Sequence, residues 1–237
     1  MEKKKKIYEG KAKIVYETDD QDLLIQYFKD DATAFNAQKK GTIDQKGVMN
    51  NAIASKIFEY LGREGVTTHF VKLLSERDML VKRVSIVPIE VIVRNRAAGS
   101  MCRLLGLAEG LVLSCPVLEY CFKKDELGDP LINEYHIKAL NIATDEEMKK
   151  ISSMALRINE SLKKFFLGLG IELIDFKLEF GRHNGDIILA DEISPDTCRL
   201  WEVGTGVKLD KDRFRRDLGN IEGAYREVLR RVSQGKN

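Results

Sequence analysis

A strand-like segment near the C-terminal end carries three charged residues at alternate positions. Residues 171–180 read IELIDFKLEF, so Asp175, Lys177 and Glu179 share one strand face and the other face is apolar. A solvated face on an outer strand would give the same alternation. The next segment, ILADEIS, adds Asp191 and Glu192, and a charged face on a central strand is costly unless something satisfies it. Carboxylates beside a lysine favour a site for Mg²⁺ and a phosphate-like anion.

A second group of candidate residues lies in VPIEVIVRNRAAGS, residues 87–100. A strand ends in Arg94 and Arg96, and a turn of small residues leads into a helix whose predicted N-cap is Ser100. A helix start with a hydroxyl and a guanidinium nearby favours anion binding. A capped helix with two surface arginines is the alternative interpretation.

Two shorter motifs add charged residues. ISPDTCRLW, residues 193–201, places Asp196 and Arg199 in a loop directly after the carboxylate strand, and loops at the ends of core strands often carry function. YEGKAK, residues 8–13, has a glycine at a strand break and lysines two positions apart. This motif could cover phosphates, but it is no Walker A loop, and taken by itself it favours a glycine-bent hairpin with solvated lysines.

The hydrophobic pattern predicts mainly strands before residue 85. Strand-like segments run over 6–16, with a break at Gly10, over 23–28 and over 79–84. One helix interrupts them, because apolar residues recur there at a strict four-residue spacing: Met49, Ile53, Ile57 and Leu61.

After residue 85 the predicted elements are mixed. A strand over 86–94 leads into a short helix after Gly99. A long helix begins at Thr144, where Glu147 completes a capping box, and stops at Gly168. The last helix is predicted to run without a break from about Asp212, with an apolar face made of Phe214, Leu218, Ile221, Tyr225, Val228 and Val232.

Between the two long helices, strands over 171–180 and 187–193 form a predicted hairpin. If Glu179 and Asp191 hold one metal ion, both must leave the same face. A two-residue turn would set Leu178 opposite Asp191 and direct that carboxylate to the apolar side. We therefore predict a three-residue loop that sets Lys177 opposite Asp191, with Gly185 in the left-handed conformation of a bulged turn.

These elements divide the chain near residue 85. Residues 1–85 form a β-rich N-terminal lobe and residues 86–237 a mixed C-terminal lobe, so the expected fold class is α+β. A chain of 237 residues can bury a sizeable core in one large domain or two small lobes.

Composition excludes several function classes. The 39 basic and 37 acidic residues leave a net charge of +2, so no overall field draws the molecule to nucleic acid or to a membrane surface. Apolar runs are far shorter than a membrane span, and no secretory signal is visible. The four cysteines form no C-x-x-C pair and, with three histidines, match no zinc spacing. We expect reduced thiols and a cytoplasmic protein.

Taken together, these motifs resemble the SAICAR synthetase family, whose activity is phosphoribosylaminoimidazole-succinocarboxamide synthesis. The resemblance runs over nearly the whole chain and includes FNAQKKGTIDQKGVMNN at 35–51, LGDPLINEYHI at 127–137, IDFKLEFG at 174–181 and LADEISPDTCRLW. It implies an ATP-dependent ligase of purine biosynthesis. Such a ligase joins the carboxylate of carboxyaminoimidazole ribonucleotide (CAIR) to the amine of L-aspartate and releases SAICAR, ADP and phosphate.

The resemblance also implies a kinase- or ATP-grasp-like ATP site between two lobes, a Mg²⁺ ion and a homodimer. For the nucleotide it implies a phosphate-covering loop, a lysine on the phosphates and a hinge residue whose backbone meets adenine. These are, in order, the loop of Gly10, Lys11, Ala12 and Lys13, then Lys82, then Val87.

For the other ligands, the resemblance implies Glu179 and Asp191 as Mg²⁺ ligands and Asp175 and Lys177 at the reacting end. The ribonucleotide binders it implies are Arg94, Ser100 and Arg199. The L-aspartate site is open between two loops, Asp129–Asn133 and Asp196–Arg199.

Two other functions remain alternatives at this stage. A small-molecule kinase on a similar two-lobed scaffold would also bind ATP and Mg²⁺, and only a requirement for an amine acceptor separates it from a ligase. A nucleic-acid-binding module could use Arg94 and Arg96, but the near-zero net charge and the lack of aromatic residues among the basic ones argue against it.

Overall fold

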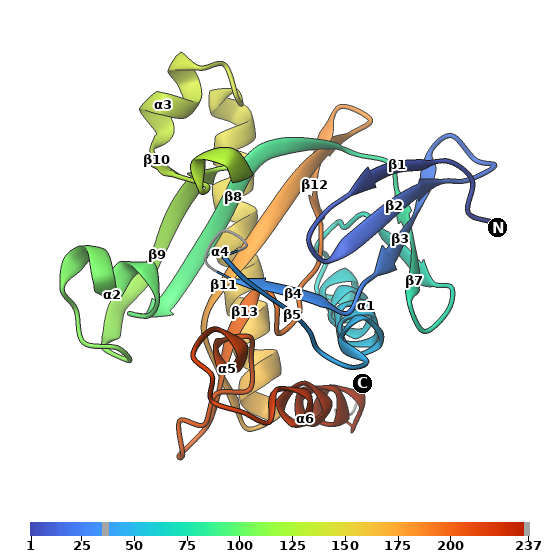
Figure 1. The fold of residues 1–237 in the computed structure, drawn as a ribbon. Coiled ribbons are helices and arrows are strands. Elements are labelled where there is room, and N and C mark those ends of the chain that lie inside the picture. The colour runs from blue at the N-terminus through green and yellow to red at the C-terminus, as the bar shows by residue number, and fades with distance from the viewer. Residues whose placement is uncertain (35–37, 235–237) are drawn as a thin grey trace.

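The computed structural model describes residues 1–34 and 38–234 of the chain. The motif that begins at Phe35 therefore has its first three residues outside the described part. The fold is a mixture of strands and helices, as predicted, and it is organised around two antiparallel sheets and a two-stranded ribbon (Figure 1).

The first sheet has five antiparallel strands in the order β1-β2-β3-β7-β6. The strands predicted over 6–16, 23–28 and 79–84 are confirmed, and the break at Gly10 is the turn between β1 and β2. The pattern did not predict the edge strand β6. The five strands are β1 (Lys6–Glu9), β2 (Lys13–Glu17), β3 (Leu23–Phe28), β6 (Phe70–Leu73) and β7 (Asp78–Lys82).

Helix α1 (Lys46–Arg63) packs on this sheet against β3, β6 and β7. Its four-residue apolar repeat is buried, which confirms the predicted helix face. The strands β4 (Asp31–Ala34) and β5 (Lys39–Thr42) form the separate ribbon.

The second sheet has the order β10-β9-β8-β11-β12, and β13 also pairs with β11. Strand β11 is therefore hydrogen-bonded on both sides, as the strand-like segments that flank it in the sequence indicated. Helix α4 contacts β8, β11 and β12 and covers the apolar side of the sheet (Figure 1). The strands are β8 (Ser85–Arg96), β9 (Val112–Phe122), β10 (Leu131–Ile132), β11 (Ile171–His183), β12 (Asp186–Ala190) and β13 (Cys198–Glu202).

The helices of the second half follow the sequence pattern with two exceptions. Helix α4 (Asp145–Gly168) begins with the predicted capping box, in which Thr144 accepts from the backbone of Glu147 and the reverse bond is also made. The shorter helices are α2 (Ser100–Leu105), α3 (Glu134–Ala139) and a 3₁₀ turn at Asp125–Leu127. The first exception is the cap of α2: Gly99 holds the N-cap position, and Ser100 is the first helical residue.

The second exception is the last helix, which is two helices. α5 (Asp212–Arg215) and α6 (Ile221–Gln234) are separated by three residues with left-handed backbone, at Asp217, Gly219 and Asn220. Left-handed residues cannot continue an α-helix, so the helix is interrupted here although the apolar spacing continues. Leu218, predicted to face inward, is instead 45% exposed.

A single cluster of buried apolar side chains runs through both sheets, from Leu24 and Met79 in the first to Val91 and Phe176 in the second. The chain passes from one sheet to the other between β7 and β8, close to the predicted boundary at residue 85. The division into lobes of residues 1–85 and 86–237 remains a proposal, because the core is shared. Among the described residues, no helix is long and apolar enough to cross a membrane.

Candidate active site

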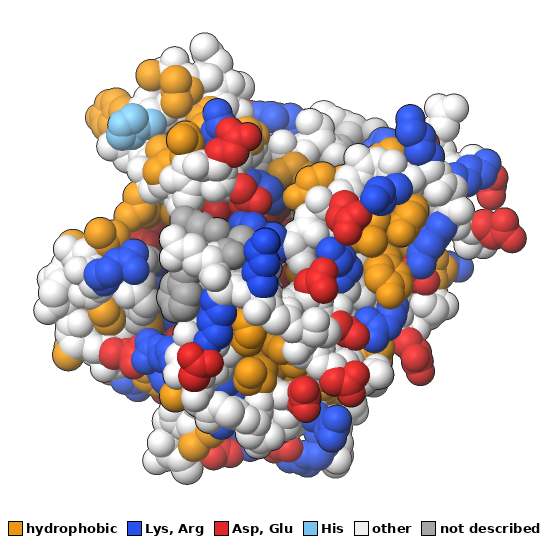
Figure 2. Space-filling view, viewed as in Figure 1, with side chains coloured by type: hydrophobic (Ala, Val, Ile, Leu, Met, Phe, Trp, Pro, Cys, Tyr) orange, Lys and Arg blue, Asp and Glu red, His pale blue; other side chains and the backbone are white. Residues whose placement is uncertain are grey.

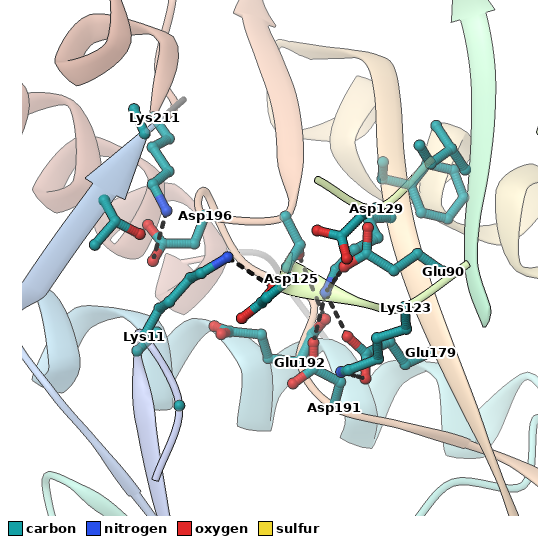
Figure 3. Close-up of a pocket in the computed structure, with 18 of the residues that line it drawn as sticks. Lys11, Glu90, Lys123, Asp125, Asp129, Glu179, Asp191, Glu192, Asp196 and Lys211 are labelled. Atoms are coloured by element: carbon teal, nitrogen blue, oxygen red, sulfur yellow. Dashed lines mark hydrogen bonds and ion pairs between the residues drawn. The ribbon is translucent and has the colours of Figure 1, made fainter. Parts of the chain in front are cut away.

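A cavity of about 720 Å³ lies between the β1–β2 turn and the face of the second sheet that α4 leaves open (Figure 3). Its walls come from segments far apart in the sequence: the β1–β2 turn, β4, β8, the start of α2, the β9–β10 connection, β11, the loop after β12, β13, and α5 with the residue before it. Charged side chains of both signs also intermingle over the outer face in Figure 2, without a patch of one sign.

The charged face of β11 forms one wall of this cavity. Asp175 and Glu179 are each only 3% exposed, and Lys177 lies between them. The pairing with β8 sets Arg94 opposite Asp175 and Glu90 opposite Glu179, so the neighbouring strand continues the charged face. The alternate residues of β11 are buried on the other side, which confirms the predicted division of the strand and excludes the solvated-edge alternative.

Lys177 is the centre of a cluster of carboxylates. Its Nζ lies 2.6 Å from Glu179 Oε1, 3.2 Å from Asp191 Oδ2 and 3.3 Å from Glu90 Oε1. Burial by itself would lower the pKa of Lys177, but the three carboxylates outweigh it and raise the pKa well above 10.5. The lysine therefore stays charged and holds Glu179 and Asp191 around one point.

Two lysines of the β1–β2 hairpin reach the cavity from the first sheet. Lys13 pairs with Asp191, and its Nζ lies 3.0 Å from Glu192 Oε1. These carboxylates outweigh the burial that would lower the pKa of Lys13, and they raise it. Lys11 Nζ lies 2.8 Å from Asp125 Oδ1 on the opposite wall, and Figure 3 shows the two side chains directed toward each other. Lys13 is therefore a buried partner of the carboxylates and not a solvated lysine.

The hairpin register differs from the prediction. Arg182 pairs with Ile187 and His183 with Asp186, so the turn has two residues, Asn184 and Gly185, with φ of 50° and 79°. Two successive residues at positive φ match the type I′ turn that an Asn-Gly pair favours. The three-residue loop and the Lys177–Asp191 pairing were wrong, although Gly185 does adopt the predicted left-handed conformation.

Asp191 nevertheless reaches the charged face, because the strand ends before it. Strand β12 ends at Ala190, and Asp191 follows it with a φ of 59°. A left-handed residue breaks the alternation of faces. The carboxylate that a continuing strand would have directed to the apolar side therefore contacts Lys13 and Lys177. The shared face was predicted correctly from the wrong register.

Arg94 and Ser100 form a second cluster in the same cavity. The buried Arg94 guanidinium donates to Asp175 Oδ2 at 2.5 Å, to Glu119 Oε2 at 2.8 Å and to Ser100 Oγ at 2.8 Å. The serine hydroxyl thus contacts the arginine instead of capping its helix. Arg96 does not line the cavity, because its Nε lies 2.6 Å from Glu172 Oε1.

Arg199 joins this cluster from β13. Its Nη1 lies 2.8 Å from Asp175 Oδ2 and its Nε 3.0 Å from Asp212 Oδ2. Burial raises the pKa of Asp212, but Arg199 and Arg215 outweigh it and lower the pKa to about 2. Arg94, Ser100 and Arg199, predicted from two separate motifs, therefore meet at one end of the cavity.

Two predicted nucleotide residues lie outside the cavity wall. Lys82 is the last residue of β7, and its Nζ lies 3.4 Å from the Thr68 carbonyl oxygen. Val87 is fully buried in β8. The other four, Gly10 to Lys13, all line the cavity.

Sequence reasoning missed several lining residues. Strand alternation could have identified Glu90, because residues 90 and 94 of the same strand lie on one face. Lys123 pairs with Glu179 from the end of β9, and no local pattern marks it. Lys211 and Arg215 were hidden inside the supposed continuous last helix.

The donor set was compared with the needs of Mg²⁺. No group of three or more His, Cys, Asp or Glu in residues 1–34 and 38–234 forms a metal site by itself. A Mg²⁺ ion that also binds phosphates needs only one or two protein carboxylates. Glu179 and Asp191 fit that role, since both already surround one cation, the Lys177 ammonium.

Comparison with known proteins gives a consistent result. The family model described as SAICAR synthetase matches residues 6–232. The phosphoribosylaminoimidazole-succinocarboxamide synthase of Caldanaerobacter subterraneus is 59% identical over 99% of this chain and 100% of its own length. That of Clostridium novyi is 61% identical over 98% of this chain and 99% of its own.

Solved structures agree in fold. The synthase from Ehrlichia chaffeensis superposes with a TM-score of 0.95 at 47% identity, covering 98% of this chain and 100% of the other. A SAICAR synthetase in complex with ADP gives a TM-score of 0.93 at 48% identity, over 97% and 98% of the two chains.

Proposed function

The chain belongs to the SAICAR synthetase family, and from this premise we propose how its cavity carries out the reaction of that family. The enzyme is an ATP-dependent ligase of purine biosynthesis. It joins the carboxylate of CAIR to the amine of L-aspartate and gives SAICAR, ADP and phosphate. A small-molecule kinase is not favoured, because the matched relatives are named as synthases over their whole length.

The observation that carries the proposal is that one cavity holds two separate charge clusters. Lys13, Lys177, Glu179 and Asp191 lie toward the β1–β2 hairpin, and the arginine cluster around Asp175 lies deeper along the second sheet. A ligase of this kind must hold a nucleoside triphosphate and a ribonucleotide phosphate next to one another. A simple anion site would need only one such cluster.

The chemistry explains why both clusters are needed. A carboxylate is a poor electrophile, so an oxygen of CAIR takes the γ-phosphoryl group of ATP, ADP leaves, and loss of phosphate accompanies formation of the C–N bond. Phosphoryl transfer asks the protein mainly for positioning and for neutralisation of charge. Buried lysines that cannot lose their charge, such as Lys177, are suited to that task.

We assign the nucleotide phosphates to the β1–β2 hairpin. Lys11 and Lys13 would be the cationic partners of the phosphates, and the backbone of Gly10 and Ala12 would approach them closely. Glu179 and Asp191 would hold Mg²⁺, which when bound would neutralise phosphate oxygens. Lys82 and Val87 are proposed to meet the nucleotide beyond the described wall of the cavity, in a kinase- or ATP-grasp-like arrangement between the two lobes.

We assign the ribonucleotide to Arg94, Ser100 and Arg199. Support comes from two guanidinium groups that converge on Asp175, with the Ser100 hydroxyl against one of them, Arg94. Exchange of the internal carboxylate partner for a phosphate would keep the arginines satisfied. Asp175 and Lys177 then face the reacting end.

The quaternary state and location are also proposals. We propose a homodimer, which light scattering of the purified protein would test. We propose a cytoplasmic location, supported by four free cysteines, since disulfides are rare in that compartment.

A coupled assay of ADP release tests the function. With CAIR, ATP and Mg²⁺ present, the rate should depend on added L-aspartate, and SAICAR should form in a 1:1 ratio to ADP. Equal ADP release without L-aspartate, and no amide product, would favour the kinase alternative.

A further inference from the structure

Two cationic side chains at α5 line the cavity and have no part in the assignments above. Lys211 directly precedes α5 and Arg215 is its last residue; sequence analysis merged this short helix into its successor. The nucleotide and ribonucleotide account for the clusters at Lys177 and Arg94. A site for three substrates needs one more group of partners, and the third substrate carries two carboxylates.

Lys211 is held in the cavity without a close partner among the described residues. Its side chain is 14% exposed, and its ion-pair partner is Asp196, at 3.8 Å from Nζ to Oδ2. That carboxylate is already engaged, because Lys46 and Tyr225 donate to it at 2.6 Å each. Burial, opposed by Asp196, lowers the pKa of Lys211, as expected for an ammonium group that lacks sufficient anionic charge around it. Figure 3 shows the Lys211 side chain directed toward Asp196.

Arg215 offers a second cation close by. Its Nη1 donates to Asp212 Oδ1 at 2.6 Å, which fixes one edge of the guanidinium group. The side chain is 29% exposed and lines the cavity, so the remaining nitrogens can meet a ligand carboxylate. Arg199 shares Asp212 with it, which places Arg215 beside the ribonucleotide cluster.

The position of the pair lies between the two assigned ligands. On one side, the negative charges of Asp196 and Glu192 favour the charged form of Lys211. Glu192 also contacts Lys13 of the phosphate-covering hairpin. On the other side, Asp212 links Arg215 to Arg199. An acceptor amine must reach the carboxylate that ATP activates, and this carboxylate lies where the two ligands meet.

We propose that Lys211 and Arg215 form the subsite for the two carboxylates of the amino-acid substrate, L-aspartate. The inference rests on the proposed function and extends it to the one substrate whose site had no assignment. Thr33 and Thr197 line the same cavity and carry hydroxyl groups. Of the two loops expected from the sequence, this assignment selects the one containing Asp196.

Asp196 lies at the same place. Burial raises its pKa, but Lys211 and Lys46 outweigh burial and keep the carboxyl ionised. Because Lys46 and Tyr225 already occupy its two oxygens, Asp196 adds a fixed negative charge beside the proposed subsite and is not assigned as a direct partner of the substrate.

The test measures each substrate separately in the ADP-release assay. Lys211→Gln and Arg215→Gln should each raise the KM for L-aspartate by about tenfold or more, because each removes a charge-assisted hydrogen bond. Succinate, a dicarboxylate without the amine, serves as a competitive probe, and its Ki should rise in parallel. The KM values for CAIR and ATP should stay within about twofold.

Arg216→Gln is the matched control. Arg216 follows Arg215 directly, but its close partner is Glu109, its Nη2 lies 3.6 Å from Asp212 Oδ2, and it does not line the cavity. All four constants should be unchanged in this variant. If Lys211→Gln fails to fold, Arg215→Gln decides the result, since Arg215 is part-exposed.

The outcomes separate the inference from the function on which it rests. A wild-type enzyme whose ADP release ignores L-aspartate overturns both. An enzyme that responds to L-aspartate, with variants that alter the KM for CAIR or ATP equally or leave the Ki for succinate unchanged, overturns the subsite alone.

Discussion

At the scale of single residues, the cavity is assembled from charges that neutralise one another before any ligand arrives. Lys177 forms ion pairs with three carboxylates, and Asp175 forms ion pairs with Arg94 and Arg199. Removing one partner from such a buried pair leaves an uncompensated charge and is more costly than losing an exposed ion pair. Substitutions should therefore act on ligand binding and on stability together, and controls must separate the two.

Arg199→Ala should raise the KM for CAIR about tenfold or more and leave that for ATP nearly unchanged, since a charged hydrogen bond contributes about 1.5–3 kcal/mol. Arg96→Ala is the control, because Arg96 pairs with Glu172 away from the cavity. Steady-state kinetics with each substrate varied in turn would measure both. A weakened ATP KM with a normal CAIR KM would refute the assignment of Arg199.

Asp212 gives a prediction on pH. Its pKa of about 2 in the folded protein lies below the usual 3.8, so the unfolded chain binds the proton more tightly. Stability from this group is complete above about pH 4 and is lost as the pH falls toward 2. Asp212→Asn should be less stable at pH 7 by about 3–5 kcal/mol, as expected when a buried pair is broken. Its stability should also fall less between pH 4 and pH 2, and urea unfolding at several pH values would measure both differences.

At the scale of elements, the sequence pattern predicted the features that depend on local spacing along the chain. The α1 repeat, the α4 capping box and the alternation in β11 each depend on neighbours along the chain, and all three were confirmed. Predictions failed where single backbone conformations decide the structure. Examples are the length of the turn at Asn184, the strand alternation that Asp191 interrupts, and the break before α6, where apolar spacing continues across non-helical residues. The predicted Ser100 cap of α2 was also wrong, since Gly99 holds that position.

The candidate site shows the same limit. Residues within a motif, such as Lys13, Arg94 and Glu179, were predicted because strand alternation or a glycine-containing turn marks them. Lys123 and Lys211 were not, since only tertiary packing brings isolated lysines from the end of β9 and the start of α5 to the cavity.

The β11–β12 turn offers a test of one such backbone conformation. Gly185 has a φ of 79°, and nothing lies within 4 Å of the position its Cβ would take. Gly185→Val should therefore destabilise the protein through backbone strain alone, by about 1–3 kcal/mol. Gly185→Asn should cost clearly less, because asparagine tolerates the left-handed region. Urea unfolding of both variants measures the difference; equal stability would mean that the turn relaxes to another type.

At the scale of the whole molecule, the shared core links the two sheets into one unit. Apolar side chains of β3, β7, β8 and β11 belong to one cluster, and Lys13 ties the first sheet to the loop after β12. The cavity lies across this junction, so both sheets must be in place for it to exist.

Thermal unfolding should accordingly show one cooperative transition. Saturation with Mg·ADP at about 100 times its Kd should stabilise the protein by about 2.7 kcal/mol and move the single Tm by about 5–10 °C. Differential scanning calorimetry would measure this. Two resolved transitions, with only one of them shifted by the nucleotide, would contradict a shared core.

The left-handed backbone at Asp191 also limits which amino acids this position can accept over evolution. Aspartate, asparagine and glycine visit a φ of 59° at low cost, whereas a longer or branched side chain is penalised before its chemistry matters. Glutamate is therefore a poor replacement at 191, although it would supply the same carboxylate. A lineage that lost the reaction should drift to Asn or Gly here, while Glu179, in an ordinary strand, should drift more widely. An Asn or Gly at this one position would then be the trace that such a loss leaves in a sequence.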